Sequence, residues 1–244
     1  MNRESMRPNK EDKPPFKDDF AMADFLPSEK FYKLKALENN PDVVVRKDEF
    51  PIMTPSELRE RRKELQIFKK LCDELQEQYG IHLPDSQLVV GVNDSNQKMT
   101  QIYTVVERIY GDNIEEALKQ IGFQPIRTEL EMFYGKLLDY FDDKYEKHAP
   151  MISDLFNFQL MYGHRRGEKK DHIYFVDLDP FFTKKRVQYR VLPDIAQMIG
   201  EAELSTGEKL INTRERFKET FSKLSPTDQR SLRENHHYIQ SLLE

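Results

Sequence analysis

Short apolar runs separated by polar turns dominate the first part of the chain after residue 24. Apolar and polar residues alternate over 31–37, and three consecutive valines open the run at 43–47, a pattern typical of strands. Asparagine-, aspartate- and proline-containing segments at 39–42, 93–96 and 110–113 predict turns or breaks between strands. The predicted strands are 31–37, 43–47, 87–92 and 101–109.

Helical periodicity is strongest where a capping signal comes before an apolar stripe. Thr54-Pro55-Ser56-Glu57 combines an N-cap threonine, a first-turn proline and a glutamate three residues on, and Gly80 follows the stripe as its end. Thr128 to Glu131 has the same capping pattern. The predicted helices are 54–79, 113–120, 128–147, 193–203, 208–224 and 226–243.

A hairpin is predicted between the two helical parts, with strands at 156–162 and 173–176 around a charged loop at 163–171. Its second strand runs directly into Asp177 and Asp179. Carboxylates at the end of a buried strand cost desolvation energy unless a partner binds them. A metal ion, a basic side chain or a helix N-terminus would serve as that partner.

Strands early and helices late predict an α+β fold of two lobes rather than one continuous sheet. We expect a disordered tail at 1–24, because this segment is charged, proline-rich and poor in apolar residues. Residues 25–110 are expected to form a β-rich lobe with one long helix. Residues 111–244 are expected to form a helical lobe that carries the hairpin.

Charge and composition limit the partners. Lys plus Arg number 38 against 43 Asp plus Glu, a net charge of −5 that gives no overall attraction to nucleic acid or acidic membrane. No run approaches the ~18 apolar residues that span a bilayer. The single cysteine, Cys72, excludes an internal disulfide, and the N-terminus has no apolar secretory segment. We therefore expect a cytoplasmic protein with neither a nucleic-acid nor a membrane partner.

The order of these elements, with these residues, resembles the protein-kinase-like fold in its aminoglycoside/choline phosphotransferase-like form. The resemblance covers roughly residues 31–182. Its segments are the lysine strand at 43–47, the glutamate helix at 54–79, the last strand, hinge and glycine at 103–111, the catalytic loop at 153–159 and the metal-binding aspartate segment at 173–179.

The resemblance implies a cleft for ATP and Mg²⁺, since phosphoryl transfer needs hard oxygen ligands that neutralise phosphate charge. Asp154 would position or deprotonate the acceptor hydroxyl. The implied nucleotide contacts are Lys47 and Glu107, and the implied metal ligands are Asp177, Gln159 and Asp179.

The sequence departs from that family in three places. Gly80 is the first glycine of the chain, so no glycine-rich phosphate loop precedes the lysine strand. Ile152 stands where the family has a histidine, and Gln159 where it has an asparagine. These departures favour a degenerate, pseudokinase-like member.

Each candidate also has a purely structural interpretation. Asp177 would cap a backbone N–H, with Asp179 and the following proline forming a turn. Asp154 would be an N-cap or loop residue, and Gln159, for which we favour this interpretation, a polar residue on the open face of a strand. Lys33 and Lys35 are alternatives to Lys47 as the phosphate-binding lysine. The glutamate that would pair with this lysine is also open, among Glu57, Glu60 and Glu64.

Two hypotheses about function follow. In the first, the chain is a degenerate kinase-like protein that keeps a magnesium–nucleotide cleft and has weak or absent phosphotransferase activity. In the second, it is a non-catalytic interaction or scaffold protein whose helical C-terminal region binds a protein partner.

Overall fold

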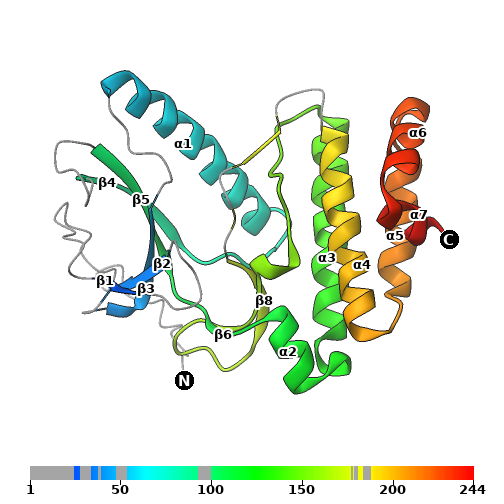
Figure 1. Ribbon diagram of the computed structural model, residues 1–244, viewed down its shortest axis with the longest axis horizontal. Coiled ribbons are helices and arrows are strands. Elements are labelled where there is room, and N and C mark those ends of the chain that lie inside the picture. The colour runs from blue at the N-terminus through cyan, green and yellow to red at the C-terminus, as the bar shows by residue number, and fades with distance from the viewer. Residues whose placement is uncertain are drawn as a thin grey trace, which may run out of the picture. The chain divides into compact units, whose positions relative to one another are not determined.

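The computed structural model describes residues 25–27, 34–37, 40–47, 54–92, 100–176, 178, 181–183 and 188–244. The chain divides into two compact units (Figure 1). The first takes its residues from Met1–Thr54 and Ser86–Val106, and the second from Pro55–Asp85 and Glu107–Glu244. The predicted α+β class, with a β-rich part and a helical part, is confirmed. The predicted tail at 1–24 and turn at 93–96 lie outside the described residues.

The first unit is a five-stranded sheet in the order β1-β2-β3-β5-β4. Val43, Val45, Tyr103 and Val105 are its buried residues among those described. All four predicted strands appear within it. The turn expected at 39–42 is wrong from Asn40 onward, because Asn40 already pairs with β2. The strands are β1 (Phe25–Pro27), β2 (Leu34–Leu37), β3 (Asn40–Lys47), β4 (Ser86–Val92) and β5 (Thr100–Glu107).

The long helix α1 (Pro55–Glu77) forms as its capping pattern predicts, and Gly80 follows it with a φ of 64°, a left-handed conformation that glycine adopts without strain. The helix belongs to the second unit, whereas we expected it in the β-rich lobe. Leu71 and Leu75 join the apolar core of that unit. An ion pair between Glu74 and the largely buried Lys144 also links α1 to the second unit.

Helices supply most of the second unit, and α3 lies at its centre. Leu130, Leu137, Leu138 and Phe141 on α3 are completely buried. Packing of this apolar face, rather than helix propensity, stabilises such an element. The helices after α1 are α2 (Ile114–Ile121), α3 (Phe123–Glu146), α4 (Leu192–Thr206), α5 (Ile211–Ser222), α6 (Pro226–Asn235) and α7 (His237–Leu243).

Several predicted helix boundaries are wrong; α5, for example, begins at Ile211 rather than at residue 208. α3 begins directly after Gly122, so Thr128 lies inside the helix and its capping pattern is not used. The last predicted helix is two helices, because His236 has extended backbone between α6 and α7. The predicted cap of α6 is confirmed, since the Ser225 side chain accepts a hydrogen bond from the Asp228 N–H.

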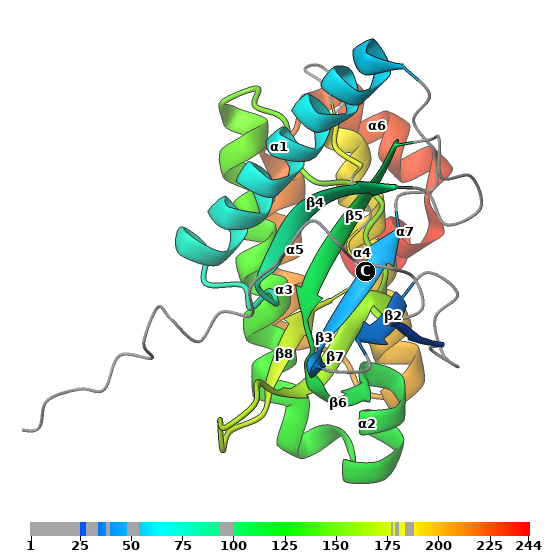
Figure 2. The same cartoon turned by 90° about the vertical axis from the view of Figure 1, so that its left-hand side faces the viewer.

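A three-stranded antiparallel sheet, β6-β7-β8, lies beside α2 and α3 (Figure 2). Gly111 on β6 faces Gly163 on β7, and a Cβ at Gly111 would lie 2.2 Å from the Tyr162 carbonyl oxygen. Only glycine fits where two backbones approach this closely. The break predicted at 110–113 is therefore wrong, because these residues pair as a strand. The strands are β6 (Tyr110–Asn113), β7 (Leu160–His164) and β8 (His172–Phe175).

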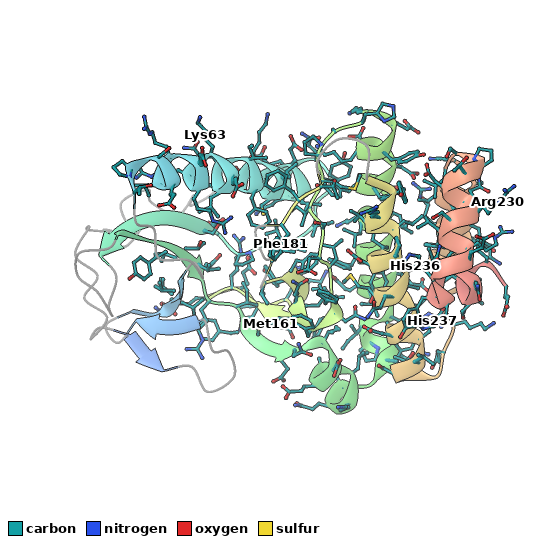
Figure 3. All side chains as sticks on the ribbon, turned by 45° about the horizontal axis from the view of Figure 1, so that its top comes forward. Lys63, Met161, Phe181, Arg230, His236 and His237 are labelled. Carbon is teal, nitrogen blue, oxygen red and sulfur yellow. The ribbon has the colours of Figure 1, made fainter. Side chains whose placement is uncertain are left out.

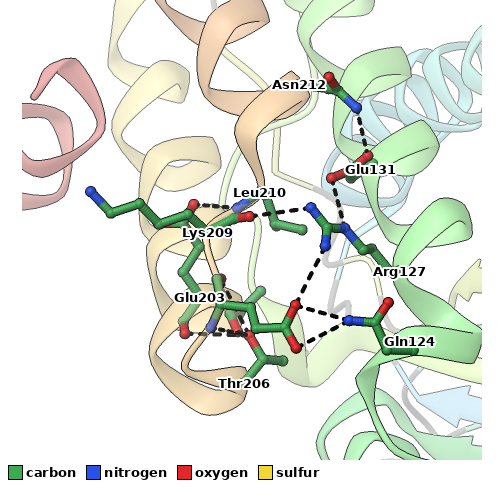
Figure 4. A network of polar contacts seen from close by, with 10 residues as sticks. Gln124, Arg127, Glu131, Glu203, Thr206, Lys209, Leu210 and Asn212 are labelled. Carbon is green, nitrogen blue, oxygen red and sulfur yellow. Dashed lines mark hydrogen bonds and ion pairs between the residues drawn. The ribbon is translucent and has the colours of Figure 1, made fainter.

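A polar network joins the start of α3 to the turn between α4 and α5 (Figure 4). Arg127 contacts Glu131, Glu208 and the Lys209 carbonyl oxygen, while Gln124 donates to Glu208. The network fixes how α5 approaches α3. None of its residues is a predicted site residue, so we assign the network a structural role.

Candidate functional site

The predicted catalytic loop, residues 153–159 and called here the Asp154 loop, is held in place by hydrogen bonds to α3 and α4. The Ile152 N–H donates to the Tyr140 hydroxyl at 2.9 Å. The Tyr134 hydroxyl donates to Asn157 Oδ1 at 2.9 Å, and Asn157 Nδ2 donates to the Met198 carbonyl oxygen at 2.7 Å. Burial raises the pKa of both tyrosines, so their hydroxyls stay protonated as hydrogen-bonding groups.

Asp154 has a left-handed backbone, with a φ of 64°. A non-glycine residue in this region is strained, and such strain persists only where the surroundings enforce it. The surroundings here include Asp194 in the first turn of α4, whose Oδ2 accepts the Asp154 N–H at 3.2 Å. The Leu155 N–H bonds to the same carboxylate.

The partly buried Asp194 carboxylate has an unusual pKa. Its pKa is raised from 3.8 to about 6, chiefly by burial and also by the neighbouring Asp154 charge, which together outweigh the lowering by the two backbone N–H groups. Desolvation dominates because the carboxylate has no cationic partner among the described residues. Asp194 therefore supports the Asp154 loop at a cost in folding free energy at neutral pH.

The Asp154 side chain is partly exposed. Within the described ranges, its carboxylate makes no hydrogen bond or ion pair, although its backbone is fixed on both sides. A carboxylate in this situation can accept a proton or a hydrogen bond from a molecule that reaches it.

Gln159 is 1% exposed and lies at the end of the 3₁₀ turn η3 (Asn157–Gln159), not on an open strand face as we preferred. Its Oε1 accepts the Phe156 N–H at 2.9 Å, and its Nε2 donates to the Asp154 carbonyl oxygen at 3.3 Å. The strand predicted from 156 accordingly begins only at Leu160, because 157–159 turn to close the loop. The Gln159 amide thus shapes the loop from within.

Two segments flanking residues 177–180 are hydrogen-bonded to the ends of the Asp154 loop. The Val176 N–H donates to the Gln159 carbonyl oxygen at 2.8 Å. On the other side, the Ser153 N–H donates to the carbonyl oxygen of Phe181, which Figure 3 labels, at 3.2 Å. Asp177 and Asp179 come between these anchors in the sequence and lie outside the described residues.

Glu107 forms the last residue of β5 and contacts the hairpin loop. Its carboxylate accepts the Asp85 N–H at 3.2 Å and pairs with Arg165 Nε at 3.3 Å. Burial raises the pKa of Glu107, and Arg165 lowers it. Arg165, in the charged loop at 163–171, also donates to the Leu83 carbonyl oxygen at 2.8 Å. Glu107 is thus part of a structural junction between the hairpin and 83–85.

Lys47 is the last residue of β3, in the first unit, and its side chain lies outside what the structure describes. The predicted site residues that the structure does bring together are Asp154 and Gln159, on one loop. Among the described residues no group of three His, Cys, Asp or Glu side chains is gathered as metal ligands. None of the described helices is long and apolar enough to cross a membrane.

Three supporting residues were missed from the sequence: Tyr134, Tyr140 and Asp194. Tyr134 and Tyr140 belong to the apolar pattern of α3, where an aromatic residue is interpreted as part of the hydrophobic core. Asp194 follows Pro193 at a helix start, which reads as an ordinary first-turn acid. Only the fold shows that these side chains converge on 152–157.

No family model matches the chain, and no curated protein matches it. It is similar in structure to a twitchin kinase fragment from C. elegans, described as an autoregulated protein kinase with immunoglobulin domains, at a TM-score of 0.44 and 12% identity. That match covers 86% of this chain and 53% of the other, so the chain spans about half of the twitchin fragment. It is also similar to WaaP in complex with acyl carrier protein, at a TM-score of 0.45 and 10% identity over 90% and 88% of the two chains. At these values the likenesses carry no argument about function.

Proposed function

We propose that this chain is a degenerate kinase-like protein that binds a magnesium–nucleotide and has weak or absent phosphotransferase activity. The observation that carries the proposal is the double anchoring of the Asp154 loop. Its two ends bond to the segments on either side of 177–180, and its backbone is strained at Asp154, next to one of these ends. Strain that the surroundings enforce is characteristic of functional sites.

In this proposal the carboxylates of Asp177 and Asp179 bind Mg²⁺, a cation that prefers one or two carboxylates together with phosphate oxygens. Asp154 accepts a hydrogen bond from the acceptor hydroxyl. Gln159 acts through the loop backbone, because both polar atoms of its amide are already hydrogen-bonded.

The weak activity in this proposal follows from the absence of a glycine-rich loop before the lysine strand at 43–47. Without a glycine before Gly80, the backbone N–H groups of that region approach phosphate less closely. Transition-state stabilisation in phosphoryl transfer depends on such positioning, so a site of this kind loses catalysis before it loses binding.

Thermal unfolding with and without Mg²⁺ and ATP tests the proposal. A ligand that binds only the folded chain raises the midpoint by mass action. We expect a magnesium-dependent rise in the wild type, its loss in Asp177→Ala, and its retention in Asp112→Ala, which removes a carboxylate from β6. No rise at millimolar ATP in a folded sample would overturn nucleotide binding.

The second candidate is a non-catalytic interaction protein, and one observation favours it. Leu204 near the end of α4 is 75% exposed and Ile211 at the start of α5 is 57% exposed. Large exposed apolar side chains on two consecutive helices suit contact with a protein. A variant carrying Leu204→Ser and Ile211→Ser that keeps its melting midpoint but loses a protein partner would support this candidate.

A further inference from the structure

A pocket in the second unit opens beside the Asp154 loop. Its volume is about 380 Å³, and it is lined by residues of α2, of the loop and of α4. Glu115 comes from α2, Phe156 and Phe158 from the loop, and Glu201 and Leu204 from α4. None of the residues that line it is a lysine, arginine or histidine.

Two aromatic rings form an ordered wall of this pocket. Phe156 and Phe158 are stacked, with ring centroids 5.1 Å apart and planes inclined by 13°. Phe158 is 52% exposed, a high value for a phenylalanine. The negative face of an aromatic ring attracts a cation placed over it.

The two glutamates provide negative charge at the same pocket. Glu201 is fixed, because it accepts hydrogen bonds from Gln197 Nε2 at 2.7 Å and from Asn157 Nδ2 at 3.3 Å. Glu115 is exposed, and its carboxylate makes no ion pair with another described residue. Each carboxylate has about four lone-pair positions, so both keep acceptor capacity for a ligand.

We propose that this pocket binds the guanidinium group of an arginine side chain from a partner polypeptide. A guanidinium is planar, so it can stack on a phenylalanine ring while its N–H groups donate to carboxylates. An ammonium is a compact and more strongly hydrated charge, so it gains less from the rings. The exposed rim at Phe158 and Leu204 suits a side chain that enters from a chain lying across the surface.

The inference does not depend on nucleotide binding, since every lining residue lies in the second unit and none is a proposed nucleotide contact. It does specify where a partner would lie. Phe156 is two residues after Asp154, so a bound arginine would hold the partner chain close to the loop that carries the candidate catalytic carboxylate.

Proton NMR of a short peptide, acetyl-Gly-Ser-Arg-Gly-Ser-amide, tests the proposal without ATP or Mg²⁺. We expect the arginine δ-protons to move upfield on binding the wild-type protein, because they enter the shielding region above a ring. A peptide with lysine in place of arginine should bind more weakly, and one with neutral citrulline should bind most weakly of the three. Phe158→Leu should reduce the upfield shift, since only the Phe156 ring then remains in the wall, and weaken binding by about 3-fold.

Charge removal gives the decisive comparison. The combined Glu115→Gln and Glu201→Gln variant should bind the arginine peptide at least about 10-fold more weakly, since charge-assisted bonds are lost. Glu115→Gln alone, at an exposed position, should weaken binding without changing the melting midpoint. Glu215→Gln removes an equal charge from α5 and should bind as the wild type does. Equal binding by the combined variant, or by the citrulline peptide, would overturn the proposal.

Discussion

The contribution of Asp194 to the free energy of unfolding should fall as pH rises from about 4 to 6. A carboxyl group with a higher pKa in the folded state than in the unfolded state keeps its proton longer when folded. Raising the pH then ionises the unfolded chain first, which lowers the free energy of unfolding. The loss is complete once pH exceeds the folded pKa of about 6.

The size of the effect follows from the pKa shift. Asp194 moves from 3.8 to about 6. At 1.36 kcal/mol per pKa unit this predicts a loss of at most about 3 kcal/mol between pH 4 and pH 7. Asp194→Asn keeps an oxygen that can accept the Asp154 N–H but cannot ionise, so this variant should lack that part of the pH dependence.

Urea unfolding of the wild type and Asp194→Asn between about pH 4 and pH 7 measures the difference. The wild type should lose stability relative to the variant across this range by up to about 3 kcal/mol. A difference between the two proteins that stays constant with pH would refute the reasoning, because it would mean that Asp194 titrates alike in both states.

Three further predictions concern the fold. Gly111→Ala should lower the free energy of unfolding by about 3 kcal/mol or more, because a Cβ there would clash with β7. Gly135→Ala, in mid-helix with nothing within 4 Å of a new Cβ, should raise it by about 0.5–1 kcal/mol. Urea unfolding that ranks the two variants in the opposite order would contradict the close contact at Gly111. Arg214→Ala should cost about 3–5 kcal/mol, because it leaves the largely buried Glu203, now bonded to Arg214 at 2.7 Å, without its cation; a cost below about 1 kcal/mol in the same assay would argue against the pair. Burial raises the pKa of the Cys72 thiol to about 12, so iodoacetamide at about pH 8 should modify native protein at least about 100-fold more slowly than denatured protein, and equal rates would show the thiol to be accessible.

Local patterns predicted those elements whose cause is local. The capping residues stand directly before or at the start of α1, the glycine stands just after its end, and the valines of β3 are consecutive. Elements that depend on distant partners were missed. Tyr110–Asn113 reads as a turn, and it is a strand only because β7, about 50 residues later, offers Gly163 opposite Gly111.

The candidate site was predictable to a similar extent. Asp154 was identified from its segment, but its strained backbone and its support from Asp194 depend on α4 packing against the loop. Gln159 was predicted either as a metal ligand or, as we preferred, as a polar residue on an open strand face, and its hydrogen bonds within the loop could not be inferred from sequence spacing. The stacked Phe156 and Phe158 likewise gave no signal, because alternate aromatic residues in a short segment indicate a strand.

The most direct test of the central proposal is calorimetric titration of the protein with ATP in the presence of Mg²⁺. The account predicts measurable heat of binding in the wild type and in Asp112→Ala, much weaker binding when Mg²⁺ is chelated, and none in Asp177→Ala. Binding that is unchanged by both chelation and Asp177→Ala, or no binding in the folded wild type, would contradict it.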